Sequence, residues 1–208
     1  MLLALLIATA PQVPLFSDPR LSEALGGFQQ REGAWVEYAV LPRRGPQTRL
    51  KASLLASRAP RGRYWLEIVS EQQGGLPVAV KMLLHGPPGT MENVERIYLY
   101  VAGQAPVELP LDEARADAGE PPRRPLPQVR HEGIEPLDLA AGKFRCDVLQ
   151  IEGSRLYRSG RVPLWGMVRA VTPEERIELI GFGESGAVSV FPEAFGEGIQ
   201  GKGSESAK

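Results

Sequence analysis

The sequence predicts a mainly β protein, an antiparallel meander of about nine strands curled into an open barrel or half-barrel, with one or two short helices covering its apolar face. Two observations support this fold class. Apolar and charged residues alternate through runs such as Phe144–Val148 and Arg176–Leu179, so one face of each strand is dry and the other is wet. The 208 residues also include 23 glycines and 19 prolines, a share that favours many turns between short strands over long helices.

The elements follow in order along the chain. A short helix is predicted to begin at Ser17 or Asp18 as its N-cap, with Pro19 at the first helical position and Phe28 at the end of its apolar stripe. A second short helix is predicted over residues 111–118. Alternation predicts strands over residues 34–42, 49–55, 64–70, 77–84, 95–102, 107–109, 143–151, 159–171 and 175–182.

The domain organisation is predicted from changes in composition. Residues 1–10 are interpreted as a signal peptide, because an apolar run ends there in an Ala-x-Ala site; the alternative is a buried first strand or helix. This run is too short to span a bilayer, which takes about 20 apolar residues. Residues 17–195 are predicted as one β half-barrel domain with a proline-rich loop at 119–130, and residues 196–208 as a disordered tail. The expected localisation is the bacterial periplasm.

No pattern of residues predicts catalysis, a metal site or a cofactor. Gly86–Thr90 resembles the start of a phosphate-binding loop, but Met91 and Glu92 follow where that loop requires Lys and Ser or Thr. His85 and His131 have no His, Cys or Asp partner at ligand spacing. The net charge of −1 gives no basic surplus for nucleic acid. We therefore expect a protein that is not an enzyme, binds no nucleic acid and does not span a membrane.

The remaining distinctive residues are apolar and aromatic side chains in or beside the predicted strands. Such side chains either fill a small barrel or line a ligand cavity in an open one. The residues predicted to line a cavity are Trp35, Met82, Tyr98, Trp165 and Met167. The alternative for each is ordinary core packing. The single cysteine, Cys146, is interpreted as a small buried hydrophobe, with a reactive thiol as the alternative.

Six short segments together resemble a known family, the periplasmic lipoprotein-carrier-like (LolA/LolB-like) β half-barrel superfamily, and in particular its exported branch. The segments are Trp35–Tyr38, Tyr64–Glu67, Val80–Leu84, Ala141–Cys146, Val162–Val168 and Ile177–Gly183. The resemblance spans residues 31–190 and implies an unclosed barrel that binds acyl chains and carries a lipid or lipoprotein across the periplasm. The proline-rich insertion and the small number of helices depart from the family, and no family residue is carried over as a ligand contact.

Two functions follow as hypotheses. The first is a periplasmic binding protein that holds a lipid, a lipoprotein acyl chain or another apolar ligand in the concave face of the half-barrel. The second is a structural or assembly protein of the cell envelope, with a packed core, that binds a protein partner through a strand edge or the proline-rich loop.

Overall fold

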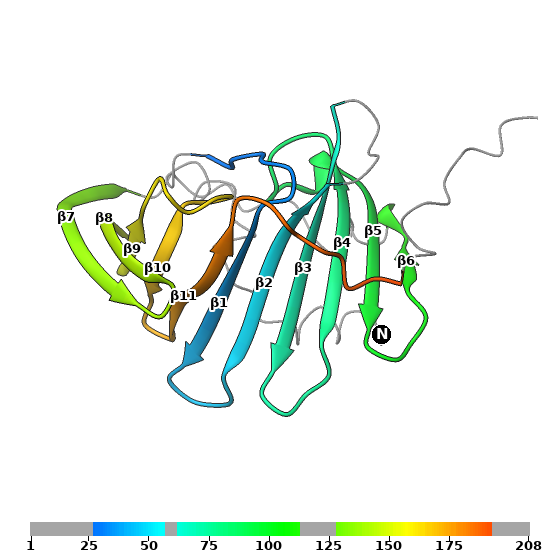
Figure 1. The fold of residues 1–208 in the computed structure, drawn as a ribbon, viewed down its shortest axis with the longest axis horizontal. Helices are drawn as coiled ribbons and strands as arrows, with labels where there is room; N and C mark the ends of the chain where they lie inside the picture. Colours follow the sequence, from blue (N-terminus) through cyan, green and yellow to red (C-terminus); the bar gives the residue numbers. More distant parts are fainter. Residues whose placement is uncertain (1–26, 57–61, 113–127, 193–208) are drawn as a thin grey trace, which may run out of the picture.

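The structure is a computed structural model that describes residues 27–56, 62–112 and 128–192. These residues form a single antiparallel sheet of 11 strands (Figure 1). The strands are β1 (Trp35–Pro42), β2 (Thr48–Leu55), β3 (Tyr64–Gln72), β4 (Val78–Leu84), β5 (Val94–Val101), β6 (Val107–Leu109), β7 (Val129–Leu139), β8 (Gly142–Ile151), β9 (Ser154–Arg158), β10 (Met167–Val171) and β11 (Glu175–Gly183).

The sheet consists of two meanders joined at one seam. Its strand order is β6-β5-β4-β3-β2-β1-β11-β10-β9-β8-β7. β1 to β6 run away from the seam in one direction, and β7 to β11 return to it from the other, so that β1 pairs with β11. Because β6 and β7 lie at opposite ends and do not pair, the sheet is not closed into a barrel. The predicted fold class, an open antiparallel meander, is confirmed.

The strand register divides the side chains of β1–β6 between two faces. Residues that are direct cross-strand partners lie on the same face of a sheet. One face, here called the inner face, carries the aligned row Leu54, Leu66, Met82, Ile97 and Leu109. The opposite, outer face carries the neighbouring row Trp35, Ser53, Glu67, Lys81, Tyr98 and Glu108.

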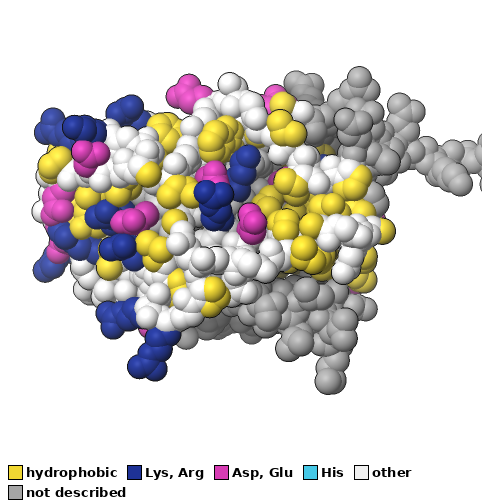
Figure 2. Space-filling model, turned by 60° about the horizontal axis from the view of Figure 1, so that its bottom comes forward, with side chains coloured by type: hydrophobic (Ala, Val, Ile, Leu, Met, Phe, Trp, Pro, Cys, Tyr) yellow, Lys and Arg dark blue, Asp and Glu magenta, His cyan; other side chains and the backbone are white. Residues whose placement is uncertain are grey.

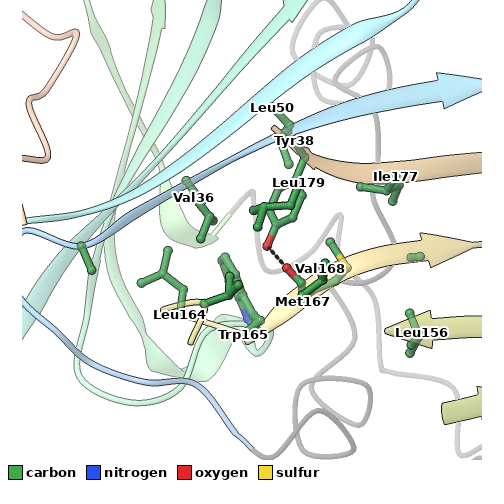
Figure 3. Packing of buried hydrophobic residues seen from close by; sticks show 14 of the residues in the cluster. Val36, Tyr38, Leu50, Leu156, Leu164, Trp165, Met167, Val168, Ile177 and Leu179 are labelled. Atoms are coloured by element: carbon green, nitrogen blue, oxygen red, sulfur yellow. Dashed lines mark hydrogen bonds between the residues drawn. The ribbon is translucent and has the colours of Figure 1, made fainter. Parts of the chain in front are cut away.

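The main hydrophobic core lies on the inner face across the seam. Val36 and Tyr38 of β1 are fully buried there, as is Leu179 of β11. Figure 3 shows Tyr38, Leu179 and Met167 close together, coming from β1, β11 and β10. The hydroxyl of Tyr38 donates a hydrogen bond of 3.1 Å to the carbonyl of Met167, reaching across β11. Burial raises the pKa of the Tyr38 hydroxyl, which therefore remains a hydrogen-bond donor at physiological pH.

The segment predicted as one strand, residues 159–171, is a strand only from Met167, and this part of the prediction is wrong. Residues 159–166 form a loop that folds onto the inner face, because Leu164 and Gly166 both adopt positive φ (63° and 70°). The apolar character of Val162, Leu164 and Trp165 suggested a strand, but these residues belong to the loop and their side chains are buried in the core.

Two strands are absent from the nine predicted, β7 and β9. β9 follows a two-residue turn, Glu152-Gly153, in which both residues have positive φ, as type I′ hairpins require. β7 begins inside the predicted proline-rich loop 119–130 and is exposed along most of its length. It is an edge strand paired only with β8, so it lacks the apolar alternation of a half-buried strand, and Pro136 is tolerated there.

Several predictions fall outside the described residues. These are the signal peptide at residues 1–10, most of the first helix, the second helix beyond residue 112, the proline-rich loop up to residue 127 and the tail at 196–208. The domain boundary at 17–195 stays a prediction. Within the ranges that the structure describes, no helix is long and apolar enough to cross a membrane.

The Tyr38–Met167 hydrogen bond gives the first testable prediction. Tyr38→Phe should lower the free energy of unfolding by about 1–3 kcal/mol, because it leaves a buried carbonyl without its partner. Tyr100→Phe, at a half-buried ring on the outer face, is the matched control and should change stability by less than about 0.5 kcal/mol. Urea unfolding followed by tryptophan fluorescence measures both, and equal effects would contradict the role given to this bond.

Candidate functional site

The structure places the predicted cavity-lining residues on two different faces of the sheet. Met82 lies on the inner face, in register with Leu66 and Ile97. Trp165 and Met167 belong to the core cluster on that same face. Trp35 and Tyr98 lie on the outer face, in the row that contains Glu67 and Lys81. One concave surface therefore brings together three of the predicted residues and not the other two.

The inner face is tightly filled near the seam. Trp165 is 1% exposed and Met167 is fully buried. Phe28 packs between the rings of Trp165 and Tyr64, with centroid distances of 5.2 Å and 5.7 Å. The loop is held in place by a bridge in which the Gln29 N–H donates to the Leu164 carbonyl at 2.8 Å. These contacts make Trp165 and Met167 part of the packed core over β1, β10 and β11.

The inner face is less completely covered over β3, β4 and β5. Four apolar side chains there, here called the β3–β5 patch, are only partly buried: Ile68, Val80, Met82 and Leu99. Ile68, Val80 and Leu99 are direct partners across three neighbouring strands, and Met82 belongs to the adjacent row. The patch adjoins the packed core through Leu66, which is 1% exposed. It is a continuous apolar surface of the kind that an apolar ligand can cover.

Sequence reasoning identified Met82 in this patch but missed its neighbours. Val80 and Met82 share a face by simple alternation, so the strand itself could have indicated both. Ile68 and Leu99 come from two other strands, and only the cross-strand register brings them beside Val80.

On the outer face, Trp35 lies flat across β11. A Cβ atom at Gly183 would come within 2.5 Å of the Trp35 indole nitrogen, and one at Gly181 within 3.3 Å of its ring. The glycines of β11 therefore make room for this side chain. The Lys51 ammonium lies 5.0 Å from the centre of the ring, a cation–π contact. Trp35 is thus engaged with the sheet and with Lys51 on the face opposite the patch.

The outer face over β3–β5 is covered by the segment after β11. Residues 187–192, here called the strap, cross this face beside Tyr98, which is 4% exposed (Figure 1). Glu67 and Lys81 lie beneath the strap, only 1% and 5% exposed. Burial lowers the pKa of Lys81, and the charge of Glu67 partly offsets that effect. Two buried charges in this row could not be predicted from alternation, which assigns charged residues to solvent.

The rest of the surface is charged and mixed. Figure 2 shows blue and magenta side chains interspersed on the side of the molecule that holds β7–β9 in Figure 1, and yellow side chains gathered toward β5 and β6. Arg155 contacts Glu132 at 2.7 Å and Glu135 at 2.6 Å, so opposite charges on β7 and β9 offset each other. A hollow of about 230 Å³ at the ends of β2 and β3 has a polar lining unsuited to an apolar ligand: Gln47, Arg49, Glu71 and Gln73.

The histidines lie apart from each other and from any metal-binding cluster. The Nδ1 of His85 lies 3.5 Å from a Glu95 oxygen, and Arg63 also pairs with that carboxylate. His131 lies on the exposed strand β7. Among the residues that the structure describes, no three His, Cys, Asp or Glu side chains are grouped as a metal ion would need. Among the described residues, the His85 ring therefore contacts the Glu95 carboxylate that Arg63 also holds, and His131 lies at the exposed edge.

No protein-family model matches the chain, and no curated protein sequence is significantly similar to it. Three solved structures have a backbone fold that is partly similar to that of this chain. A candidate lipoprotein from Parabacteroides distasonis is 10% identical, with a TM-score of 0.38 over 75% of this chain and 97% of that one. A candidate exported protein with a YmcC-like fold from Bacteroides fragilis is 9% identical, with a TM-score of 0.35 over 75% and 98%. MucB is 15% identical, with a TM-score of 0.35 over 83% of this chain and 58% of MucB. Scores this low describe a loose likeness and carry nothing about function.

The environment of Cys146 gives a second prediction. Its side chain is fully buried, and burial, with the nearby charge of Asp147, raises the pKa of the thiol to about 11. At pH 8 the native thiol should therefore react with iodoacetamide at least about 100-fold more slowly than in urea, since the thiolate is the reactive species. Mass spectrometry of the alkylated chain measures both rates. Comparable rates in the two conditions would indicate a reactive cysteine instead.

Proposed function

We propose that this chain is an exported, non-enzymatic binding protein that holds an apolar ligand, a lipid or a lipoprotein acyl chain, on the β3–β5 patch of its inner face. The observation that carries the proposal is the row of partly buried apolar side chains at Ile68, Val80 and Leu99, with Met82 beside it. The apolar run at residues 1–10 supports export to the periplasm.

The chemistry of the patch fits a hydrocarbon chain. Its four side chains carry no charge and no hydrogen-bonding group, so they favour a ligand that needs neither. Covering such a surface is favourable by about 0.8 kcal/mol per buried CH₂ group. Met82 is suited to this role, because its flexible thioether adapts to ligands of different shape. The packed core around Trp165 and Phe28 forms one boundary of the patch, since Phe28 also stacks on Tyr64 of β3.

Native mass spectrometry of protein exported to a periplasm, before and after mild delipidation, tests this proposal. We expect a discrete added mass, lost on delipidation, that identifies as a lipid.

Binding of a fluorescent fatty acid to the delipidated protein then locates the site. Met82→Glu should weaken binding by at least about tenfold, because a carboxylate is costly to cover with hydrocarbon. Val69→Glu, at a half-buried residue on the outer face of β3, is the matched control and should bind normally.

A milder variant keeps the test decisive where Met82→Glu disturbs folding. Val80→Thr keeps the volume of the side chain but replaces one methyl of the patch by a hydroxyl, so it should weaken binding measurably while disturbing the fold less than a carboxylate would. Either of two results would contradict the proposal: a bare mass that added lipids do not change, or fatty-acid binding to the folded Met82→Glu and Val80→Thr variants that is as tight as binding to the native protein.

A second function, an envelope assembly module that binds a protein partner, is favoured by one observation. β7 offers 11 residues at an open edge of the sheet, most of them exposed. A bulge between His131 and Gly133 and the proline at 136 interrupt this edge, so a partner strand could pair with only part of it. Stoichiometric capture of an envelope protein that is lost on deleting residues 120–127 would favour this function.

A further inference from the structure

The strap occupies a defined slot on the outer face. It leaves β11, and the Ala187 N–H donates to the Gly33 carbonyl at 2.9 Å beside the start of β1. It then crosses the face toward β5, shown in orange in Figure 1. It ends with the ring of Phe191 5.4 Å from the ring of Tyr100. The slot is therefore the part of the outer face over β3–β5 that the strap contacts, on the opposite side of the sheet from the inner-face patch and independent of its proposed ligand.

The centre of the slot is a buried carboxylate. One oxygen of Glu67 accepts the Ser189 hydroxyl at 2.5 Å, and the other accepts the Val190 N–H at 3.0 Å. The Ser189 oxygen in turn accepts the Phe191 N–H at 3.2 Å. Glu67 is 1% exposed, so these contacts are made away from water, where hydrogen bonds to a charged group are strong. The Glu67 carboxylate thus accepts hydrogen bonds from both a backbone N–H and a hydroxyl side chain of the strap.

An aromatic subsite lies beside this carboxylate. Phe191 is 6% exposed and packs with Ala79, Tyr98 and Tyr100. The Lys81 ammonium lies 5.5 Å from the centre of the Phe191 ring and 5.2 Å from that of Trp65. Val188 and Val190, in contrast, point outward and are 73% and 45% exposed. The slot therefore selects an extended segment with a hydroxyl residue, any residue and then an aromatic residue.

The strap is held in a way that permits release. It is not a strand of the 11-stranded sheet, so its departure breaks none of the ladder. It follows a bend after β11 that leads into Gly186, at φ +85°. Glu67 and Lys81 are direct cross-strand partners, so an empty slot would expose two neighbouring residues of opposite charge and not a lone charge.

We propose that this slot is a recognition site for an extended protein segment of the hydroxyl-x-aromatic pattern, supplied by a partner, and that the chain's own strap is its competitive occupant. The carboxylate of Glu67 anchors the hydroxyl and backbone N–H of the incoming segment. The subsite formed by Ala79, Tyr98, Tyr100 and Lys81 takes its aromatic ring. Strap and partner segment exclude each other, because both use the same groups.

The test uses the full chain and a fluorescein-labelled peptide of residues 184–192, with binding followed by fluorescence anisotropy. Phe191→Ala in the chain weakens its own strap and should make the slot at least about tenfold more available to the peptide than in the native chain. Adding Glu67→Gln to that variant should weaken peptide binding by about tenfold, because the charged acceptor is lost. Should Phe191→Ala fail to fold by circular dichroism, Ser189→Ala in the chain replaces it.

Matched peptides make the result specific. The peptide with Val190→Ala should bind like the native one, because that side chain points outward. Peptides with Ser189→Ala or Phe191→Ala should lose most of their affinity. A native chain that dimerises with concentration, and stops doing so as Phe191→Ala, would support the proposal with a second copy as the donor. Equal binding of the native and Phe191→Ala peptides to a folded variant, or no binding at all, would overturn it.

Discussion

The pairing of β1 with β11 is the constraint on which the rest of the structure depends. It joins a meander that begins near one end of the described chain to one that finishes near the other. Contacts between such distant segments must offset a large loss of chain entropy. The buried side chains at the seam supply the apolar burial, and the Tyr38–Met167 hydrogen bond ties β1 to β10 across the intervening strand. Both candidate binding surfaces lie on strands that this seam holds in register with the other half of the sheet.

The two halves of the sheet differ in which residues fill the core on the inner face. β1–β6 cover the inner face with regularly alternating side chains, whereas residues 159–166 cross it as an irregular loop. Positive φ at Leu164 and Gly166 turns this loop so that Trp165 enters the core. The apolar side chains of this loop are buried in the same core cluster against which the partly buried residues of the β3–β5 patch pack.

Much of the fold could be predicted from sequence, because an open antiparallel meander needs only alternation and turn residues. What alternation could not supply was register. Trp35 and Tyr98 were grouped with Met82, but cross-strand pairing places them on the opposite face. Alternation did not predict β7, because an edge strand that is exposed to solvent on both faces shows no regular alternation of apolar and polar residues. The burial of Glu67 and Lys81 could not be predicted, because a short sequence window does not contain the distant strap that covers them.

The central strands β3 and β4 carry both surfaces, and this explains their composition. Ile68, Val80 and Met82 face inward to the patch, while Glu67 and Lys81, each next to one of them in sequence, face the strap. A one-residue slip in register would exchange the two sets, placing two charged side chains in the patch and apolar side chains in the slot. The contacts of Glu67 with the strap oppose that slip, since its carboxylate would lose the Ser189 hydroxyl and the Val190 N–H in a dry environment. The same buried carboxylate that anchors the strap in the outer slot therefore also helps keep the inner patch apolar.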